Sequence, residues 1–440
     1  MNGPTMRPLR FCFLSTFHPP YSFGGDAIDV ERFAGALTSR GHEVTVVHDL
    51  DAYAVLAHGD RVSPPKTNGI EVIGLRSRLG PLSPLLTQQM GRPVAHGRRL
   101  RRLFRERRFD VVIFGNVSLV GGPGALSLGG DAVRVYLAQE HWLVCASHVL
   151  WRHNREACDG RQCLRCVLRH RRPPQLWRYT GYLERQLRHV DVFVARSEFS
   201  RDKHREFGFP RPMEVLPYFL PARAPGPAAD GPSPHDRPYF LFVGRLERIK
   251  GLDTVIPVMA GYPDADLLVV GDGEQAQELK TLARGNPRVR FAGRVPNGEL
   301  GRYYRHAIAA IVPSVGFETF GIVLIEAFQH RTPVIARRLG PFPEIVQQSG
   351  GGLLFGDDAE LVSAMRDLQA NPARRAELGE LGYRAATERW SEDVVVGGFL
   401  DIVVRAAEAR ASRLGTRAPA WLAGVPQGLS GQLELPIARH

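Results

Sequence analysis

The sequence predicts an α/β protein made of two Rossmann-like domains, each with a parallel sheet covered by helices on both faces. Three observations lead to this prediction. The chain has 440 residues, which is too long for one ordinary hydrophobic core. Short apolar runs rich in β-branched residues alternate with amphipathic stretches of helical length. A segment with six prolines, residues 220–238, divides this alternation into two halves and is predicted to be a linker.

Each half contains several apolar runs that are predicted to be strands. In the first domain, residues 1–219, they occupy residues 10–15, 43–48, 70–75, 110–116, 133–139 and 190–197. In the second domain, residues 239–390, they occupy residues 239–245, 266–273, 289–294, 308–314 and 332–336. Because parallel sheets bind ligands at the carboxyl ends of their strands, we expect a ligand cleft between the two domains.

The composition is that of a soluble globular protein, with 44% apolar and 23% charged residues. No run of about 18 apolar residues could span a membrane. The apolar run near the N-terminus stops at Pro19-Pro20 and fits a buried strand better than a signal peptide. Five cysteines give no even disulfide framework, so we expect a cytoplasmic protein.

The net charge of +12 belongs entirely to the first half of the chain. Residues 1–220 contain 32 Lys and Arg against 20 Asp and Glu, and the remaining residues balance. Two arginine-rich segments, residues 98–108 and 152–178, dominate this excess. They indicate either an anionic partner, such as a membrane surface, a phosphate-bearing substrate or nucleic acid, or simply a solvated helix face.

The segment Phe317–Phe328 carries two carboxylates in a mostly apolar run. A helix is predicted from about Gly321 to Gln329, and the free amides of its first turn favour binding of a phosphate. Glu318 precedes this helix and Glu326 lies inside it, roughly 12 Å away at the helical rise. That separation exceeds the ~5–9.5 Å of glycosidase carboxylate pairs and suits two ends of one extended ligand. The alternative is a capping Glu318 and a solvent-facing Glu326.

Two further loops contain residues suited to phosphate binding. Gly244-Arg245 ends a predicted strand, and Lys250 follows five residues later, so two cations could clamp a diphosphate. Gly24-Gly25 separates the first strand from the first helix, where glycine allows close approach of the backbone to a ligand. Neither loop is specific alone.

Together these segments resemble the retaining glycosyltransferases of the GT-B fold, family 4, also called glycosyl transferases group 1. The resemblance covers roughly residues 8–400. It rests on the Gly24-Gly25 loop, on residues 244–251, 271–273 and 313–327 with the Glu-x7-Glu spacing, and on residues 340–346 and 351–355. It implies two domains facing a cleft and a C-terminal helix, residues 391–411, that crosses back to the first domain. Residues 412–440 are then expected to form a tail.

The resemblance also implies roles for individual residues. Arg245 and Lys250 would bind the donor diphosphate, Glu326 the ribose hydroxyls, and Glu318 the donor sugar near its anomeric carbon. His141 matches the active-site histidine of the family and would contact the donor sugar. The expected donor-binding set is completed by Gly24, Gly25, Gly244, Phe320, Gly321, Ile322, Val323 and Leu324.

The implied chemistry is a hexosyl transfer from a nucleotide-diphosphate sugar without a catalytic metal. The two cations and the helix N-terminus would stabilise the leaving diphosphate, so the clamp makes a catalytic Mg²⁺ unnecessary. Retention in such folds is explained by attack on the face that the leaving group departs from, with the leaving phosphate taking the acceptor proton. No catalytic cofactor is therefore expected.

Four of the five cysteines, Cys145, Cys158, Cys163 and Cys166, fall within 22 residues in an insert spanning residues 145–175. Their spacing, C-x12-C-x4-C-x2-C, could hold a structural zinc ion. The alternative is free or redox-active thiols. The insert adjoins His141 and is expected to shape the acceptor side.

The acceptor is not identified by any motif. First domains of this family bind the acceptor, so the basic first half suggests a lipid-linked or phosphorylated acceptor at the inner face of a membrane, in polysaccharide biosynthesis. Leu100, Leu103 and Phe104 among the arginines would support peripheral attachment. A soluble acceptor is the rival. A sugar-nucleotide epimerase or phosphorylase would keep the fold, and a nucleic-acid-binding protein with a zinc knuckle is disfavoured because the sugar-nucleotide motifs would have no purpose.

Overall fold

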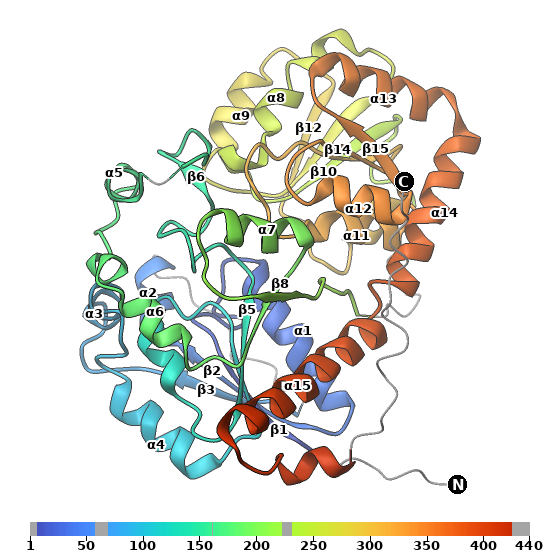
Figure 1. Cartoon of the computed structure of the whole chain (residues 1–440). Coiled ribbons are helices and arrows are strands. Elements are labelled where there is room, and N and C mark those ends of the chain that lie inside the picture. Colours follow the sequence, from blue (N-terminus) through green and yellow to red (C-terminus); the bar gives the residue numbers. More distant parts are fainter. Residues whose placement is uncertain (1–6, 58–68, 161, 222–230, 425–440) are drawn as a thin grey trace, which may run out of the picture.

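The computed structural model describes residues 7–57, 69–160, 162–221 and 231–424. Two α/β domains lie one above the other in Figure 1, with the first domain below, in blue to green, and the second above, in yellow to orange. The predicted linker falls partly, and the predicted tail largely, outside the described residues. The structure confirms the predicted α/β architecture with two parallel sheets.

The first domain is built on a seven-stranded parallel sheet, in the order β3-β2-β1-β4-β5-β8-β9. Its strands are β1 (Arg10–Leu14), β2 (Glu43–Asp49), β3 (Glu71–Leu75), β4 (Val111–Phe114), β5 (Val133–Ala138), β8 (Val192–Ala195) and β9 (Met213–Val215). Its helices are α1 (Gly25–Ser39), α2 (Leu50–Leu56), α3 (Leu82–Met90), α4 (Gly97–Arg107), α5 (Cys163–Arg169), α6 (Tyr182–Leu187) and α7 (Glu198–Glu206). A small antiparallel pair, β6 (Trp151–Arg152) and β7 (Glu156–Ala157), lies within the cysteine-bearing insert.

The second domain repeats the design with six parallel strands, in the order β12-β11-β10-β13-β14-β15. Its strands are β10 (Tyr239–Val243), β11 (Asp266–Val270), β12 (Val289–Gly293), β13 (Ala310–Val312), β14 (Val334–Arg337) and β15 (Gly352–Phe355). Its helices are α8 (Leu252–Val255), α9 (Ala276–Leu282), α10 (Leu300–Arg305), α11 (Ile322–Gln329), α12 (Phe342–Ser349), α13 (Asp358–Ala370) and α14 (Pro372–Glu388). In both domains the order reverses beside the first strand, which is where Rossmann-like folds place ligands.

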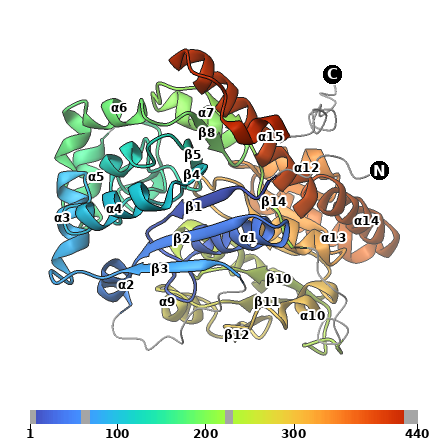
Figure 2. The same ribbon diagram turned by 90° about the horizontal axis from the view of Figure 1, so that it is seen from below.

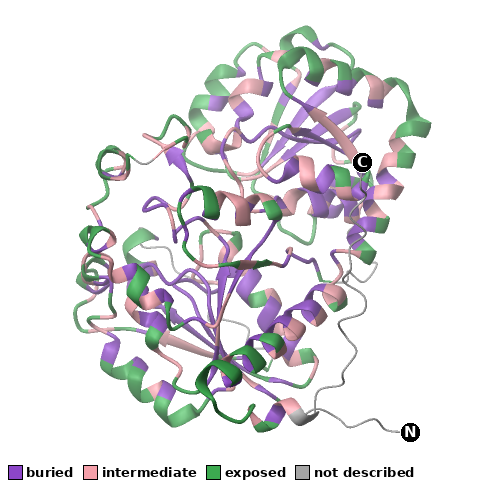
Figure 3. Ribbon diagram, viewed as in Figure 1, coloured by how far each residue is buried: buried purple, intermediate pink, exposed green. Residues whose placement is uncertain are grey.

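Burial explains why these runs become strands. All five residues of β11 and all four of β4 are buried, and the burial view shows purple strands between helices that are green on their outer faces (Figure 3). Strands covered on both faces cannot show the polar alternation of half-exposed strands, so their sequences read as continuous apolar runs. The three-residue strand β9 and the strand β15, which begins with glycine, lack such a run and escape sequence-based prediction.

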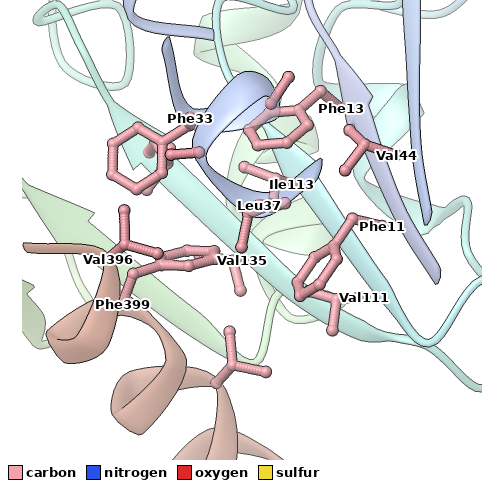
Figure 4. Close-up of a cluster of buried hydrophobic side chains, with 14 of the residues drawn as sticks. Phe11, Phe13, Phe33, Leu37, Val44, Val111, Ile113, Val135, Val396 and Phe399 are labelled. Carbon is pink, nitrogen blue, oxygen red and sulfur yellow. The ribbon is translucent and has the colours of Figure 1, made fainter. Parts of the chain in front are cut away.

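The C-terminal helix α15 (Glu392–Leu414) returns to the first domain, as predicted. It runs in red across that domain in Figure 1 and is seen from below beside β1 and β8 in Figure 2. Its residues Val396 and Phe399 enter the same core as Phe11 of β1 and Phe33 of α1, with the Phe33 and Phe399 rings 5.4 Å apart (Figure 4). This apolar contact joins the end of the chain to the first domain.

One expectation about the surface is wrong. Leu100 and Phe104 of the arginine-rich helix α4 are 0% and 8% exposed and pack into the core of the first domain, with Leu103 packed against the same core. Their spacing of three to four residues marks the buried stripe of an amphipathic helix, so the apolar residues are not available to a membrane. The exposed side chains of this helix belong to its arginines and to Glu106. None of the described helices is long and apolar enough to cross a bilayer.

Candidate functional site

The core of the candidate site consists of two loops at the carboxyl ends of β10 and β13, which are neighbours in the second sheet. The first loop follows β10 and contains Arg245 and Lys250, and the second follows β13 and contains Glu318. The amides of Val315 and Gly316 both donate to the carbonyl of Ile249, at 2.9 and 3.3 Å. Backbone hydrogen bonds therefore hold the two loops together.

Glycine at position 251 permits this approach. Gly251 has φ +67°, and a Cβ atom there would lie 2.3 Å from the carbonyl oxygen of Pro313. No L-amino acid with a side chain fits that space, because carbon and oxygen cannot approach so closely. Gly251 thus lets Lys250 reach across to the second loop.

Lys250 and Glu318 meet directly in the structure. The Lys250 Nζ lies 2.7 Å from the Glu318 Oε1, and the Ser314 hydroxyl donates to the same oxygen at 2.7 Å. Burial alone would raise the pKa of Glu318, but the charge and hydrogen bond of Lys250, the Ser314 hydroxyl and the charge of Arg245 together lower it. Glu318 is therefore ionised at neutral pH, and its negative charge lies beside a cation.

Arg245 extends the positive charge toward solvent. Its side chain is 58% exposed and forms an ion pair of 2.7 Å with Glu247. The loop that contains Gly271 passes close to Gly244, the residue before Arg245. A Cβ atom at Gly271 would lie 1.8 Å from the Gly244 carbonyl oxygen. Arg245 therefore lies on a tightly packed turn, and the end of its side chain is exposed.

The helix α11 begins where the sequence predicts it. Gly321 precedes the helix with φ +123°, and the amide of Leu324 donates back to the Gly321 carbonyl at 3.0 Å. The amides of Ile322 and Val323 lie in the first turn of the helix, whereas the side chain of Phe320 is buried against Tyr218. Only the backbone of this segment can therefore contact a ligand through polar groups.

Glu326 lies further along α11 and faces a cavity of about 370 Å³ between the domains. The walls combine side chains of both domains: Arg32, Leu220, Pro221, Asn297, Gly298, Leu300, Tyr304, Glu326, Gln329 and His330. The Arg32 guanidinium approaches Glu326 at 3.8 Å, and the Tyr304 hydroxyl donates to it at 3.3 Å. This volume accommodates part of a nucleotide. Arg32 and Tyr304 were not predicted, because no local sequence pattern links either residue to Glu326.

The first domain contributes residues at the carboxyl ends of β1 and β5. Gly24 and Gly25 form the start of α1. The Gln139 side chain, at the end of β5, donates to the Asp26 carbonyl at 2.9 Å and to Asp29 at 2.7 Å, which ties that helix start to the segment containing His141.

His141 itself is almost completely buried, at 1% exposure. Neither of its ring nitrogens has a hydrogen-bond partner among the described residues. Burial, with the charges of His204 and Lys203, lowers the pKa of His141 well below its ordinary value. His141 is therefore a neutral side chain with two unused polar atoms, and its contact with a donor sugar stays a prediction.

Polar contacts between the domains bring the two halves of the site together. The Thr319 hydroxyl, next to Glu318, donates to the Gln139 carbonyl at 3.0 Å, and the Ser197 hydroxyl donates to the Thr319 carbonyl at 2.7 Å. Glu344 of α12 accepts hydrogen bonds from the amides of Glu198 and Phe199, both at 3.1 Å. A carboxylate of one domain thus caps helix α7 of the other, which sequence reasoning also missed.

The four clustered cysteines line a single small cavity beside these residues. No three of the described cysteine sulfurs lie within 4.8 Å of one another, and zinc binding by these cysteines stays a prediction. The predicted site residues therefore fall into four places: the Lys250–Glu318 pair with Arg245, the Glu326 cavity, the first-domain segment with His141, and the cysteine cavity.

Two family models match the chain and divide it where the structure does. Residues 23–221 match the model for glycosyltransferase family 4, and residues 228–385 match that for glycosyl transferases group 1. The first match covers most of the first domain, and the second covers most of the second domain.

Curated relatives match over part of their length. The chain is 32% identical to sulfoquinovosyl transferase of Arabidopsis thaliana over 160 residues, covering 35% of this chain and 31% of that protein. It is 31% identical to the lipopolysaccharide core biosynthesis glycosyltransferase LpsD of Rhizobium meliloti over 228 residues, covering 50% of this chain and 66% of LpsD. The match thus spans less than two thirds of either relative.

Solved structures support the fold. Sucrose-phosphate synthase of Thermosynechococcus elongatus superposes with a TM-score of 0.66 at 20% identity, covering 91% of this chain and all of that one. HepE of Anabaena, solved with UDP and glucose, superposes with a TM-score of 0.61 at 16% identity, covering 90% of this chain and all of HepE. At such identities the likeness concerns the GT-B fold alone.

Proposed function

This chain belongs to the group 1 glycosyltransferases of the GT-B fold, and on that premise we propose that it transfers a sugar from a nucleotide-diphosphate donor to an acceptor with retention of configuration. One observation carries the proposal. Helix α11 has the Lys250–Glu318 pair before its N-terminus and Glu326 in the interdomain cavity further along. An extended ligand fits this arrangement, with its sugar and diphosphate beside the Lys250–Glu318 pair and the N-terminus of α11, and its ribose beside Glu326.

The charges suit the bond that must break. Cleavage of the anomeric C–O bond leaves negative charge on the diphosphate and positive charge on the sugar ring. In this proposal Arg245, Lys250 and the first amides of α11 stabilise the diphosphate, while the ionised Glu318 faces the positive ring. The leaving phosphate takes the proton of the attacking acceptor hydroxyl on the same face. Because the cations already lie at the diphosphate, no catalytic metal is included.

The nucleoside end is assigned to the cavity around Glu326. Its carboxylate can accept hydrogen bonds from both ribose hydroxyls, and Tyr304 and Arg32 hold it in place. Since Arg32 comes from the first domain, the ribose site is complete only when the domains are together.

The donor proposal is tested by calorimetry and thermal shift with UDP-, GDP-, ADP- and dTDP-sugars. One of these is expected to bind, and Glu326→Ala is expected to weaken its binding about tenfold or more, since hydrogen bonds to a charged group contribute ~1.5–3 kcal/mol. Glu380→Ala is the matched control, because Glu380 pairs with Arg331 on the surface at 2.8 Å. Absence of binding by folded protein to all four donors would overturn the proposal.

We further propose that the acceptor is lipid-linked and is met at an anionic membrane. The supporting surface is not α4 but the exposed apolar residues of α3 and of the 3-10 helix Leu176–Tyr179, which contacts α3. Leu82, Leu85, Met90, Leu176 and Tyr179 are 42–62% exposed. Cosedimentation with vesicles that contain anionic lipid tests this proposal, and Leu82→Ser with Leu176→Ser is expected to reduce binding severalfold. Binding that is absent at low salt would contradict it.

A further inference from the structure

The cysteine-bearing insert has little regular structure to hold it. Among its described residues between Cys145 and the start of α5, the strands are limited to the two-residue pair β6 and β7. Non-glycine residues at positive φ are frequent within it: His148, Leu150, His153 and Asn154 have φ between 46° and 76°. A segment with so many unfavourable backbone conformations requires strong local constraints.

The four thiols surround one space. Cys145, Cys158, Cys163 and Cys166 all line a half-open cavity of about 20 Å³, together with Leu150, Trp151, Val167 and Phe207 among others. A space of this size holds about one water molecule or one ion. Four sulfur ligands around a space for one atom, with a C-x2-C pair at the start of α5, match the donor set of a structural zinc site.

The surroundings suit a negatively charged cluster. Four thiolates and one Zn²⁺ carry a net charge of −2. The partly buried Arg178 guanidinium lies nearby, 4.7 Å from the Trp177 ring and 5.3 Å from the Trp142 ring, and it is close enough to Cys145 and Cys163 to offset negative charge on them. The amide of His153 also donates to the sulfur of Cys166 at 3.4 Å, which is the kind of contact that orients a metal-bound thiolate.

We propose that these four cysteines bind one Zn²⁺ ion that fixes the insert in place. Binding converts the thiols to thiolates and releases their protons to solvent. No three of the described sulfurs lie within 4.8 Å of one another. The proposal therefore requires the cysteine side chains to turn inward as the ion binds.

The ion would stabilise more than the insert. The amide of Cys145 donates to the carbonyl of His141 at 2.8 Å. On the other side, Trp151 lies within 3.3 Å of the position of a Cβ atom at Gly316, and Phe317 packs against the cluster of Cys145, Leu150 and Phe207. The insert therefore bridges the segment of His141 to the loop that ends in Glu318, and the zinc site holds that bridge.

Metal analysis of the protein purified without chelator tests the proposal, and the readout does not depend on transferase activity. We expect about one zinc per chain, and less than about a tenth of that in Cys163→Ser/Cys166→Ser. Cys12→Ala is the matched control, because Cys12 lies buried in β1 away from the cluster and its loss leaves zinc unchanged.

A second measurement covers the case in which the double variant does not fold. The wild-type protein, stripped and reloaded with Co²⁺, should show the thiolate-to-cobalt charge-transfer absorption and d–d bands of tetrahedral sulfur ligation. Wild-type protein without zinc and without these bands would overturn the proposal. So would alkylation of the native protein followed by mass spectrometry, if it found two of the four cysteines joined in a disulfide.

Discussion

The two domains share one architecture, but they build their facing sides in different ways. In the second domain, backbone hydrogen bonds to Ile249 and the close packing at Gly251 set the positions of Lys250 and Glu318. In the first domain, side chains from distant elements set the positions, as Gln139 does when it joins α1 to the end of β5. One side is positioned by main-chain contacts, and the other by side-chain contacts.

The two halves of the chain also differ in net charge. Residues 1–220 carry the whole net charge of +12, and the second half is neutral. In the proposed function the donor lies on the side positioned by main-chain contacts, and the acceptor is expected on the side positioned by side chains. Variants that act on one side only should show whether this contrast holds.

The largest effect is expected for Lys250→Ala on the donor side. In the proposed mechanism it removes the cation that binds the leaving diphosphate, and it leaves the partly buried Glu318 without its ion pair. Loss of one such charge typically lowers kcat about 10²–10³-fold, or ~3–4 kcal/mol. The rate of nucleoside diphosphate release from the donor found by screening measures it. Lys280→Ala, on the exposed surface of α9, is the control and should retain wild-type activity.

The same contrast explains what sequence reasoning could achieve. The second-domain residues Lys250, Glu318 and Glu326 follow from short segments with fixed spacing, because each segment is itself a strand, a turn and a helix start. The structure then places Lys250 and Glu318 in contact, a pairing that the spacing had not foreseen.

The remaining site residues depend on tertiary packing. Arg32 reaches Glu326 from another domain, and Glu344 caps α7 across 145 residues of sequence. No local pattern predicts such pairs, since they exist only once both domains have folded. The error on α4 has the same origin. The periodicity of its sequence shows an apolar stripe, but it does not show whether the protein core or a membrane covers that stripe.

Mild acid should destabilise the first domain before the second. Burial lowers the pKa of His18, His48 and His204 to about 4, and all three belong to the first domain. These histidines stay neutral in the fold but bind protons in the unfolded chain below pH 6.5. The free energy of unfolding therefore falls as pH drops from about 6.5 to 4, by ~2 kcal/mol or more at pH 5.

Limited proteolysis at pH 7.5 and pH 5, with cleavage sites mapped by mass spectrometry, measures this difference. We expect new cleavage at pH 5 in the first domain while β10 to β14 stay protected. His306 of the second domain is exposed and provides a control, since His306→Asn should leave the pH dependence unchanged. Earlier cleavage in the second domain would contradict the prediction.

Gly251→Ala tests the backbone-determined side directly. With φ at +67° and the Pro313 carbonyl 2.3 Å from the new Cβ atom, the two loops must separate. The expected cost is about 1–3 kcal/mol in the free energy of unfolding, together with weaker donor binding. Chemical denaturation compares it with Gly397→Ala in α15, where a Cβ atom meets nothing within 4 Å and alanine should be neutral or stabilising. Equal effects at both positions would show that the close approach is unimportant.

The smallest effect is expected where the two sides meet. Glu344→Ala removes the acceptor for the amides of Glu198 and Phe199 at the start of α7, which weakens the contact between the domains. A lost cap costs about 1 kcal/mol, so the donor KM should rise roughly five-fold while kcat changes little. Asp357→Ala removes a cap of the same kind within the second domain, on Glu360, and should lower stability without changing KM. If both variants changed KM alike, the contact across the domains would contribute nothing specific to donor binding, and the donor side would act without the first domain.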